Sequence, residues 1–231
     1  MKHVLFVLSF AMLSAIGRAQ PAALLTRVDH LVYATPDLQV GIDAVEKQVG
    51  IKATAGGQHP GLGTRNALVA LGPTSYLEII GPDPEQPKPS GPRRFGIDDL
   101  KAPRIVRWVV KSSDLGAVAD NAARAGVTLG PLASGSRRRP DGVLLAWRYT
   151  DPATVVADGL VPFFIDWGSS PHPALTAARG ATLAQLRAEH PDARRVQKML
   201  DDLGLDLRVS QASRPAIIAT IDSPRGRVEL R

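Results

Sequence analysis

Along this chain, segments with the hydrophobic spacing of a strand and segments with that of a helix follow one another in a fixed order. This order occurs three times. Residues 28–34 form an apolar run with the length of one strand. The next segment places apolar side chains at the spacing of one helix face, at Leu38, Ile42, Val45 and Val49. Short apolar runs follow, and the order then starts again twice. The pattern predicts three strand–helix–strand–strand–strand units, over residues 27–81, 104–168 and 181–231.

Capping residues give the register of these units. An aspartate that can cap a helix follows each first strand, at positions 37, 114 and 192, and a glycine that can end it follows at 50, 126 and 204. We expect helices at 38–49, 115–125 and 193–203. The expected strands are 28–34, 52–55, 67–71, 76–80, 104–110, 127–129, 144–149, 162–167, 182–188, 207–210, 216–221 and 226–230. Alternatively, the units resemble one another only because such units share capping and turn chemistry.

Two segments lie outside the units. Residues 1–19 read as a secretory signal peptide, with Lys2 before an apolar stretch that is too short for a comfortable membrane span. We therefore expect an exported protein, periplasmic or secreted, with no stable membrane span; an uncleaved N-terminal anchor is the alternative. Residues 82–92 contain five prolines, which predicts a stiff extended connector or a disordered loop.

Composition narrows the classes of function. The chain has 231 residues, of which 44% are hydrophobic and 22% charged, as in globular proteins. It has no cysteine, so the fold depends on its core alone. The net charge of +6 suits anionic small ligands. Nucleic acid is not the expected partner, because the basic residues are scattered and only 5% of residues are aromatic.

Two ionisable residues interrupt apolar strands, His30 in the first strand and Glu78 in the last strand of the first unit. Such groups are costly to bury unless they are paired, hydrogen-bonded or bound to metal. His and Glu are ligand types that suit a divalent metal. A satisfied ion pair in the interior is the alternative.

Further candidates lie in glycine-rich segments. His59 lies among four glycines, where it could act as a general acid or base or contact a ligand, or simply cap a turn. Arg65 and Asn66 follow and could bind a polar substrate; a strand-edge charge and a turn residue are the alternative. The run Arg137–Arg139 could clamp a carboxylate or phosphate, and we select Arg137 as the residue that points inward. A solvated charge run is the alternative for the others.

Aromatic residues complete the candidates. The three tryptophans, Trp108, Trp147 and Trp167, all fall on expected strands and could line a pocket, although plain core packing is the favoured explanation. His172 lies on the loop that follows Trp167, where it could cover a cavity or be exposed.

The order of the units, with Asp29-His30-Leu31-Val32 at the start and Tyr76-Leu77-Glu78-Ile79 at the end, resembles the vicinal oxygen chelate superfamily. The segments 56–67, 135–142 and 162–168 are similar to its glyoxalase-like branch. The resemblance implies an α+β fold in which repeated βαβββ units form curled mixed sheets around a cavity. It also implies a divalent metal held by a His or Gln on first strands and a Glu on last strands.

Two ligand sets follow from the resemblance. If the first and third units face each other, the set is His30, Glu78, Gln185 and Glu229. If the first and second units pair, His30, Glu78 and Asp166 remain, with Arg107 at the place of the second histidine. Arg107 cannot bind a metal because it keeps its charge, and it could instead neutralise a carboxylate in a metal-free cavity or contact substrate.

The resemblance implies a metal-dependent lyase, isomerase or ring-cleaving dioxygenase that acts on a small oxygen-rich molecule. In that mechanism the metal is a Lewis acid, and Glu78, Glu229 or His59 moves the proton. The alternatives are a non-catalytic protein that sequesters small molecules in a metal-free cavity, and a structural module. The cavity could be completed within one chain or by a homodimer.

Overall fold

The computed structural model describes residues 22–231. The predicted signal peptide lies outside the described residues. Within them, no helix has both the length and the apolar composition of a membrane span. A short helix, α1 (Ala22–Arg27), precedes three successive groups of elements.

Each group contains one strand, one helix and three further strands. The first comprises β1 (Val28–Ala34), α2 (Leu38–Val49), β2 (Thr54–His59), β3 (Thr64–Gly72) and β4 (Ser75–Pro82). The second comprises β5 (Arg104–Lys111), α3 (Leu115–Arg124), β6 (Leu132–Arg138), β7 (Leu144–Thr150) and β8 (Phe163–Asp166). The third comprises β9 (Thr182–His190), α4 (Ala193–Asp202), β10 (Arg208–Gln211), β11 (Ala216–Ser223) and β12 (Gly226–Leu230).

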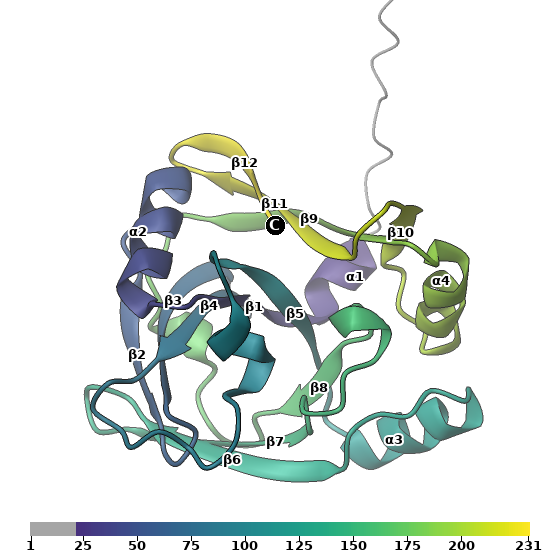
Figure 1. The fold of residues 1–231 in the computed structure, drawn as a ribbon, viewed down its shortest axis with the longest axis horizontal. Coiled ribbons are helices and arrows are strands. Elements are labelled where there is room, and N and C mark those ends of the chain that lie inside the picture. Colours follow the sequence, from purple (N-terminus) through teal and green to yellow (C-terminus); the bar gives the residue numbers. More distant parts are fainter. Residues whose placement is uncertain (1–21) are drawn as a thin grey trace, which may run out of the picture.

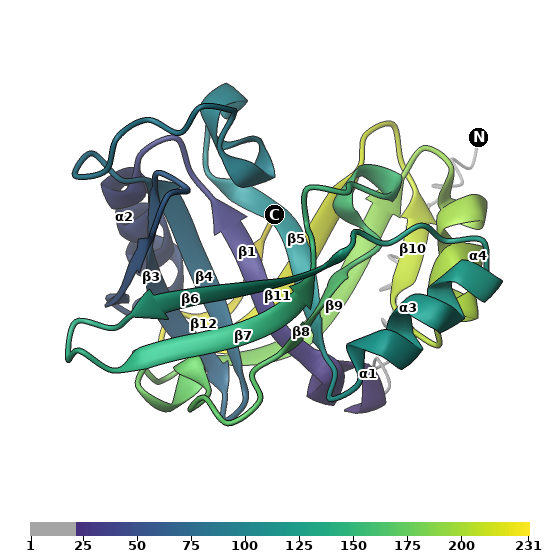
Figure 2. The same ribbon diagram turned by 90° about the horizontal axis from the view of Figure 1, so that it is seen from below.

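The first two groups share one curled sheet. Its eight strands follow the order β2-β3-β4-β1-β5-β8-β7-β6, with β1 antiparallel to β5 at the junction between the groups. In Figure 1 these strands surround a central space, and Figure 2 shows β6 and β7 crossing the other strands. The two edge strands meet where the Arg137 side chain donates a hydrogen bond to the Gly56 carbonyl. The expected α+β fold with a curled mixed sheet is confirmed.

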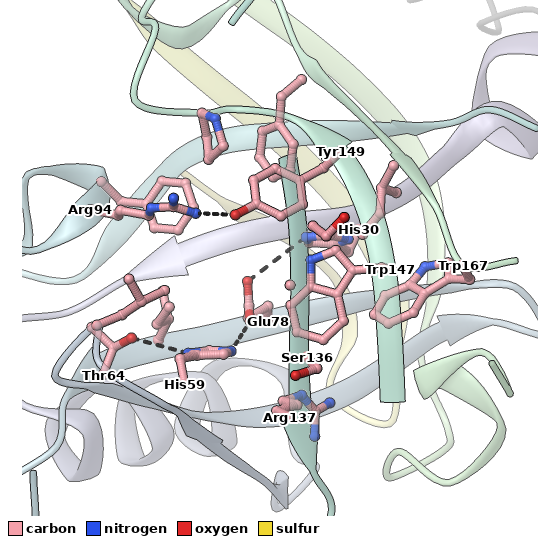
Figure 3. A pocket seen from close by; sticks show the side chains of 18 of the residues that line it. His30, His59, Thr64, Glu78, Arg94, Ser136, Arg137, Trp147, Tyr149 and Trp167 are labelled. Atoms are coloured by element: carbon pink, nitrogen blue, oxygen red, sulfur yellow. Dashed lines mark hydrogen bonds and ion pairs between the residues drawn. The ribbon is translucent and has the colours of Figure 1, made fainter. Parts of the chain in front are cut away.

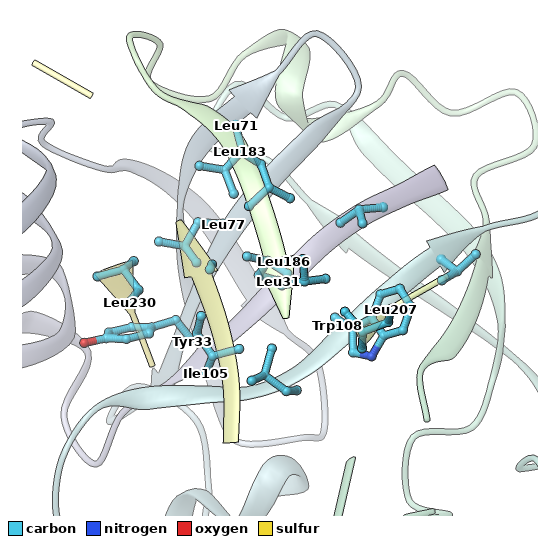
Figure 4. Close-up of a cluster of buried hydrophobic side chains, with 14 of the residues drawn as sticks. Leu31, Tyr33, Leu71, Leu77, Ile105, Trp108, Leu183, Leu186, Leu207 and Leu230 are labelled. Atoms are coloured by element: carbon cyan, nitrogen blue, oxygen red, sulfur yellow. The ribbon is translucent and has the colours of Figure 1, made fainter. Parts of the chain in front are cut away.

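The third group forms a separate sheet of order β10-β9-β11-β12. This second sheet packs on the outer face of the curled sheet, where Leu31, Leu77 and Trp108 meet Leu186 and Ile217 in one buried cluster. Figure 4 shows side chains from both sheets in this cluster. The cavity is therefore built by the first two groups, and the third supports them from outside.

The predicted caps explain where the helices begin and end. Asp37 accepts hydrogen bonds from the backbone N–H groups of Gln39 and Val40 at the start of α2. Gly50 ends that helix with a φ of 77°, a conformation that favours glycine. Asp114 and Asp192 cap α3 and α4 in the same way.

Two strands differ from the expectation. Residues 127–129 form no strand, and β6 occupies the following segment, whose serines, glycine and arginines suggested a loop. Its backbone pairs along its length with β7, from Leu132 opposite Thr150 to Arg138 opposite Leu144. Similarly, β2 extends through the glycine-rich stretch to His59, pairing with β3. Backbone pairing outweighed local composition in both segments.

The proline-rich connector also takes a defined path. It leads into a 3-10 segment, η1 (Arg94–Asp99), whose Arg94 and Phe95 line the cavity. Arg93 donates to the Gly63 carbonyl at 2.8 Å and forms an ion pair with Asp98 at 2.5 Å, which fixes the connector over β3. The segment η1, which follows the connector, is thus part of the cavity wall.

Candidate functional site

The curled sheet encloses a cavity of about 380 Å³. Strands β1 to β4 supply His30, His59, Tyr76 and Glu78 to its lining, and Figure 3 shows the two histidines on either side of the glutamate. Strands β6 to β8 and the residue after β8 supply Arg137 and a group of aromatic side chains. The ionisable histidines and the glutamate all come from the first group of elements.

Glu78 lies at the centre of the polar part of the cavity. Its side chain is 9% exposed, and its Oε1 accepts a hydrogen bond from Asn66 Nδ2 at 2.6 Å. His59 Nε2 lies 3.7 Å from the same oxygen, and His30 Nε2 lies 3.8 Å from Oε2. One carboxylate oxygen is therefore fixed by an amide, while the other faces a histidine without a close hydrogen bond.

A β-bulge orients His30. Val28 pairs with Val110 and His30 with Val109, so Asp29 is an extra residue on β1. Neighbouring residues of a regular strand point to opposite faces, but the bulge lets the Asp29 carboxylate reach His30 Nδ1 at 2.7 Å. The His30 ring stacks on Tyr76, with centroids 4.6 Å apart. Its Nε2 is left facing the cavity.

Asp29 is fully buried and gathers three nitrogen donors. Besides His30, Trp167 Nε1 donates to it at 3.1 Å and His172 Nε2 lies 3.1 Å away. The Ala174 N–H donates to His172 Nδ1, which places the His172 proton on Nε2. Burial alone would raise the pKa of Asp29, but hydrogen bonds from His172 and His30 hold it below its usual range. The charged carboxylate thus assigns the proton of neutral His30 to Nδ1.

His59 ends β2 on the opposite side of Glu78. Its Nδ1 lies 3.0 Å from the Thr64 hydroxyl, and its Nε2 lies 3.4 Å from Asn66 Nδ2. Burial lowers the pKa of His59, while the charge of Glu78 opposes this effect. Asn66 Oδ1 is buried without a hydrogen-bond partner among the described residues, so this polar network is incompletely satisfied.

Aromatic side chains form the facing wall. Trp147 lies 5.3 Å from Trp167 between ring centroids, and Phe163 stands edge-on to His30 at 6.0 Å. Arg94 donates to the Tyr149 hydroxyl at 2.9 Å and pairs with Asp151 at 3.3 Å. This wall offers a surface for an apolar ligand.

Most of the residues selected from the sequence come together here. The cavity lining includes His30, His59, Glu78, Arg137, Trp147 and Trp167. Asn66 supports Glu78, and His172 reaches the site through Asp29 rather than as a cavity residue.

Three selected residues point elsewhere. Trp108 lies in the core on the outer face of the curled sheet, where its indole donates to the Leu160 carbonyl at 2.7 Å. Arg107 is buried but lines no cavity; it donates to the Val106 carbonyl at 2.7 Å. Arg65 is half-exposed and lies 3.7 Å from Glu85. The expectation that Trp108 lines the pocket is therefore corrected, since it points to the other face of the sheet. Contact of Arg65 or Arg107 with a substrate stays a prediction.

The remaining metal-ligand candidates are not assembled around the cavity. Asp166 accepts from the Gly168 N–H at 2.8 Å, while its neighbours Ile165 and Trp167 face the cavity. Gln185 and Glu229 belong to the second sheet, and Glu229 pairs with Arg187 at 3.1 Å. The set that required the first and third units to face each other is therefore not formed.

Several site residues were not found from the sequence. Asp29 carried an available signal, since it is a second ionisable residue in the apolar first strand. Tyr76 lies two residues before Glu78 on the same strand, but it was not assigned a role. Arg94, in the 3-10 segment after the proline-rich connector, and Tyr149, on an ordinary strand, carried no local signal.

The comparisons with known proteins place this geometry in a family. Residues 28–204 match the glyoxalase-like domain. The chain belongs to the glyoxalase-like domain family. It is a member of the vicinal oxygen chelate superfamily, as the sequence resemblance predicted. A search of curated proteins found no match for this glyoxalase-like protein.

Solved structures add likenesses of fold. A hypothetical protein from Staphylococcus aureus is 13% identical, with 82% of this chain and 87% of that chain covered and a TM-score of 0.60. Methylmalonyl-CoA epimerase from Mycobacterium tuberculosis is 22% identical, with 62% and 87% covered and a TM-score of 0.39. A 4-hydroxymandelate synthase variant from Streptomyces coelicolor is 13% identical, with 88% and 61% covered and a TM-score of 0.45. The similarity to the epimerase and to the synthase gives no information about the activity of this chain.

Superfamily members commonly bind divalent metals, and strand register tests whether this chain fits that pattern. In β1 and β4, His30 pairs with Tyr76, and Glu78 lies two residues further along β4. In β5 and β8 the corresponding pair is Val109 and Phe163, followed by Ile165. Among residues 22–231, no three His, Asp or Glu side chains form a group that could hold a metal. The described residues therefore do not fit the implied four-ligand site.

Proposed function

We propose that this glyoxalase-like protein is an enzyme that moves a proton on a small oxygen-rich molecule, as an isomerase or lyase. The observation that supports this most is the buried Glu78 carboxylate, with Oε1 fixed by Asn66 and Oε2 directed toward His30. A fixed carboxylate beside an apolar wall is suited to act as a general base.

The neighbouring histidines give the site a route for the proton. Glu78 removes a proton from a carbon next to a carbonyl group of the substrate. His59, whose Nε2 lies 3.7 Å from Glu78 Oε1, takes up this proton from Glu78 and returns it to the substrate, which restores both side chains. Asp29 keeps the His30 ring in place beside Glu78 through its hydrogen bond with Nδ1.

Solvent-exchange NMR tests this proposal whichever product the reaction forms. The chain is incubated in D₂O with a panel of 2-oxoaldehydes and 2-oxo acids, and deuterium incorporation at carbon is followed. We expect incorporation by the wild type and a loss of about 100-fold or more in Glu78→Gln. The exposed Glu85→Gln is the matched control and keeps the wild-type rate. Equal rates in Glu78→Gln and the wild type would contradict the assignment of the base.

The metal-dependent form of the proposal has a separate test. Elemental mass spectrometry of the wild type, His30→Ala and Glu78→Ala measures metal content while circular dichroism follows folding. About one equivalent of metal, lost in both folded variants, would support a metal-dependent lyase, isomerase or dioxygenase and would add catechols to the panel. No bound metal after incubation with nickel, zinc, iron and manganese would contradict it.

A sequestering protein is the second candidate function. It is favoured by the apolar residues Val109 and Ile165, since β5 to β8 supply no histidine or carboxylate to the cavity lining. Tight binding of a small molecule without any exchange of its protons would identify this function.

A further inference from the structure

One cation in the cavity forms no ion pair among residues 22–231. Arg137, on the edge strand β6, is 3% exposed, yet its only hydrogen bond within residues 22–231 goes to the Gly56 carbonyl, and it has no ion pair there. The two arginines that follow it differ. Arg138 is exposed and donates to the Gly142 carbonyl at 3.0 Å, and Arg139 pairs with Asp141.

This arrangement is unfavourable for the protein alone. A buried charge is costly unless it is paired, and a guanidinium has five N–H donors, which suit a carboxylate. Burial lowers the pKa of Arg137, with Tyr76 and Glu78 opposing this effect, but an arginine keeps its proton at neutral pH. Since Arg137 lines the same cavity as Glu78, an anionic ligand there would supply the missing partner.

The surroundings of Arg137 define the rest of such a ligand. Trp147 packs against Gly135 of β6, where a Cβ atom would lie 2.7 Å from the indole. Trp167 continues this aromatic surface, with its ring centroid 5.3 Å from that of Trp147, and Phe163 also lines the cavity. Aromatic side chains of this kind bind flat, apolar molecules. Figure 3 shows Arg137 on the Ser136 side of the cavity, with Trp147 and Trp167 above it.

The charge of the ligand follows from the other cations. Arg94 also lines the cavity, but Asp151 and the Tyr149 hydroxyl occupy its guanidinium. Of the two arginines that line the cavity among the described residues, only Arg137 therefore lacks an anionic partner. One unpaired cation matches a singly charged carboxylate better than a doubly charged phosphate.

We propose that the cavity binds a small aromatic carboxylate, with the carboxylate paired to Arg137 and the ring against Trp147 and Trp167. This inference deepens the proposed function and rests on it, since it names the substrate class of the same cavity. In this arrangement, the substrate carbon that bears the carbonyl oxygen lies between Arg137 and Glu78.

Calorimetric titration with three probes tests the inference: benzoate, its uncharged analogue benzamide, and phenyl phosphate. We expect wild-type protein to bind benzoate about tenfold or more tightly than benzamide, and more tightly than phenyl phosphate. Arg137→Gln is expected to bind benzoate and benzamide equally, while Arg138→Gln, the matched control on the same strand, keeps the wild-type preference. Circular dichroism shows whether each variant is folded.

The wild-type comparison keeps the test decisive even if Arg137→Gln does not fold. Equal binding of benzoate and benzamide by the wild type, or binding of none of the three probes, would overturn the inference. Tighter binding of phenyl phosphate would overturn the assignment to carboxylates. Binding by Glu78→Gln separates this inference from the proposed function: a retained preference for benzoate in that variant supports the carboxylate site whether or not Glu78 proves to be the base.

Discussion

At the scale of single residues, the site depends on a carboxylate that never contacts the cavity. Asp29 is buried behind His30 and accepts hydrogen bonds from the side chains of His30, Trp167 and His172. It thereby connects a candidate catalytic histidine, one aromatic wall residue and the loop that follows β8. Its role is to position the site, because its effect on a ligand passes through those three side chains.

Replacement of this carboxylate by an amide should weaken all three contacts. We expect Asp29→Asn to lower the free energy of unfolding by about 1–3 kcal/mol, because buried donors lose a charged acceptor. Urea denaturation measures this change, and the exposed Asp43→Asn should stay within about 0.5 kcal/mol of the wild type. Nitrogen NMR of the His30 ring gives a second measurement. An unchanged proton position on this ring in Asp29→Asn would contradict the role given to Asp29.

The buried His59 predicts a dependence of stability on pH. Its pKa in the folded protein is lowered from 6.5 by burial, so the unfolded chain binds this proton more readily. The contribution to stability is complete above pH 6.5 and decreases as pH falls below it. We expect the free energy of unfolding to fall less steeply between about pH 7 and pH 5 in His59→Gln than in the wild type. Identical slopes in denaturation experiments at these pH values would count against a buried neutral His59.

At the scale of elements, the cavity is closed by the contact between the two edge strands, β2 and β6. Gly57 on β2 has a φ of 147°, and a Cβ atom there would lie 2.4 Å from the Arg138 carbonyl oxygen. The adjacent Gly56 supplies the carbonyl that Arg137 binds. The two strands therefore contact each other through one side-chain hydrogen bond and through a close approach at Gly57 that leaves no room for a side chain.

Gly57→Ala should separate these strands. We expect it to lower the free energy of unfolding by about 1–3 kcal/mol more than Gly61→Ala. Gly61 is the matched control because its φ is also positive, at 75°, but no atom lies within 4 Å of a Cβ placed there. Denaturation of the two variants measures the difference. Equal losses would mean that backbone strain alone, rather than the contact with Arg138, limits this position.

The sequence predicted elements well where local chemistry sets them. Each helix start is marked by an aspartate that accepts hydrogen bonds from nearby backbone N–H groups, namely Asp37, Asp114 and Asp192. These boundaries could therefore be predicted from the sequence. Site residues could be predicted where a single ionisable residue interrupts an apolar strand, as His30 and Glu78 do. The register of the strands could not be predicted from the sequence. Asp166 and Ile165 differ by one position, and a shift of one residue turns a side chain to the other face of the sheet.

At the scale of the whole molecule, the two sheets stabilise each other. The outer face of the curled sheet contributes Leu31, Leu77 and Trp108 to the cluster that it shares with the second sheet. The pairing of units was the feature that the sequence could not decide, because each unit has its own apolar face. In the structure, the third unit packs against the outer face of the curled sheet that the first two units form.

Leu186, on β9, tests this support at a distance from the cavity. It is fully buried between the sheets, and we expect Leu186→Ala to lower the free energy of unfolding by about 2–5 kcal/mol. Leu175→Ala is the control, since Leu175 is 53% exposed and should change stability by about 0.5 kcal/mol or less. Thermal or urea unfolding of both variants gives the comparison. A small loss in Leu186→Ala would show that the second sheet folds separately.

The unequal contribution of the two halves of the curled sheet has a consequence for how the protein can change. His30, His59 and Glu78 come from the first half, whereas Trp147, Tyr149 and Phe163 come from the second. Substitutions in β7 and β8 can therefore alter the shape of the accepted molecule and leave the proton-moving groups in place. Proteins that share the first half of the sheet and differ in β7 and β8 would thus bind different molecules at the same polar groups.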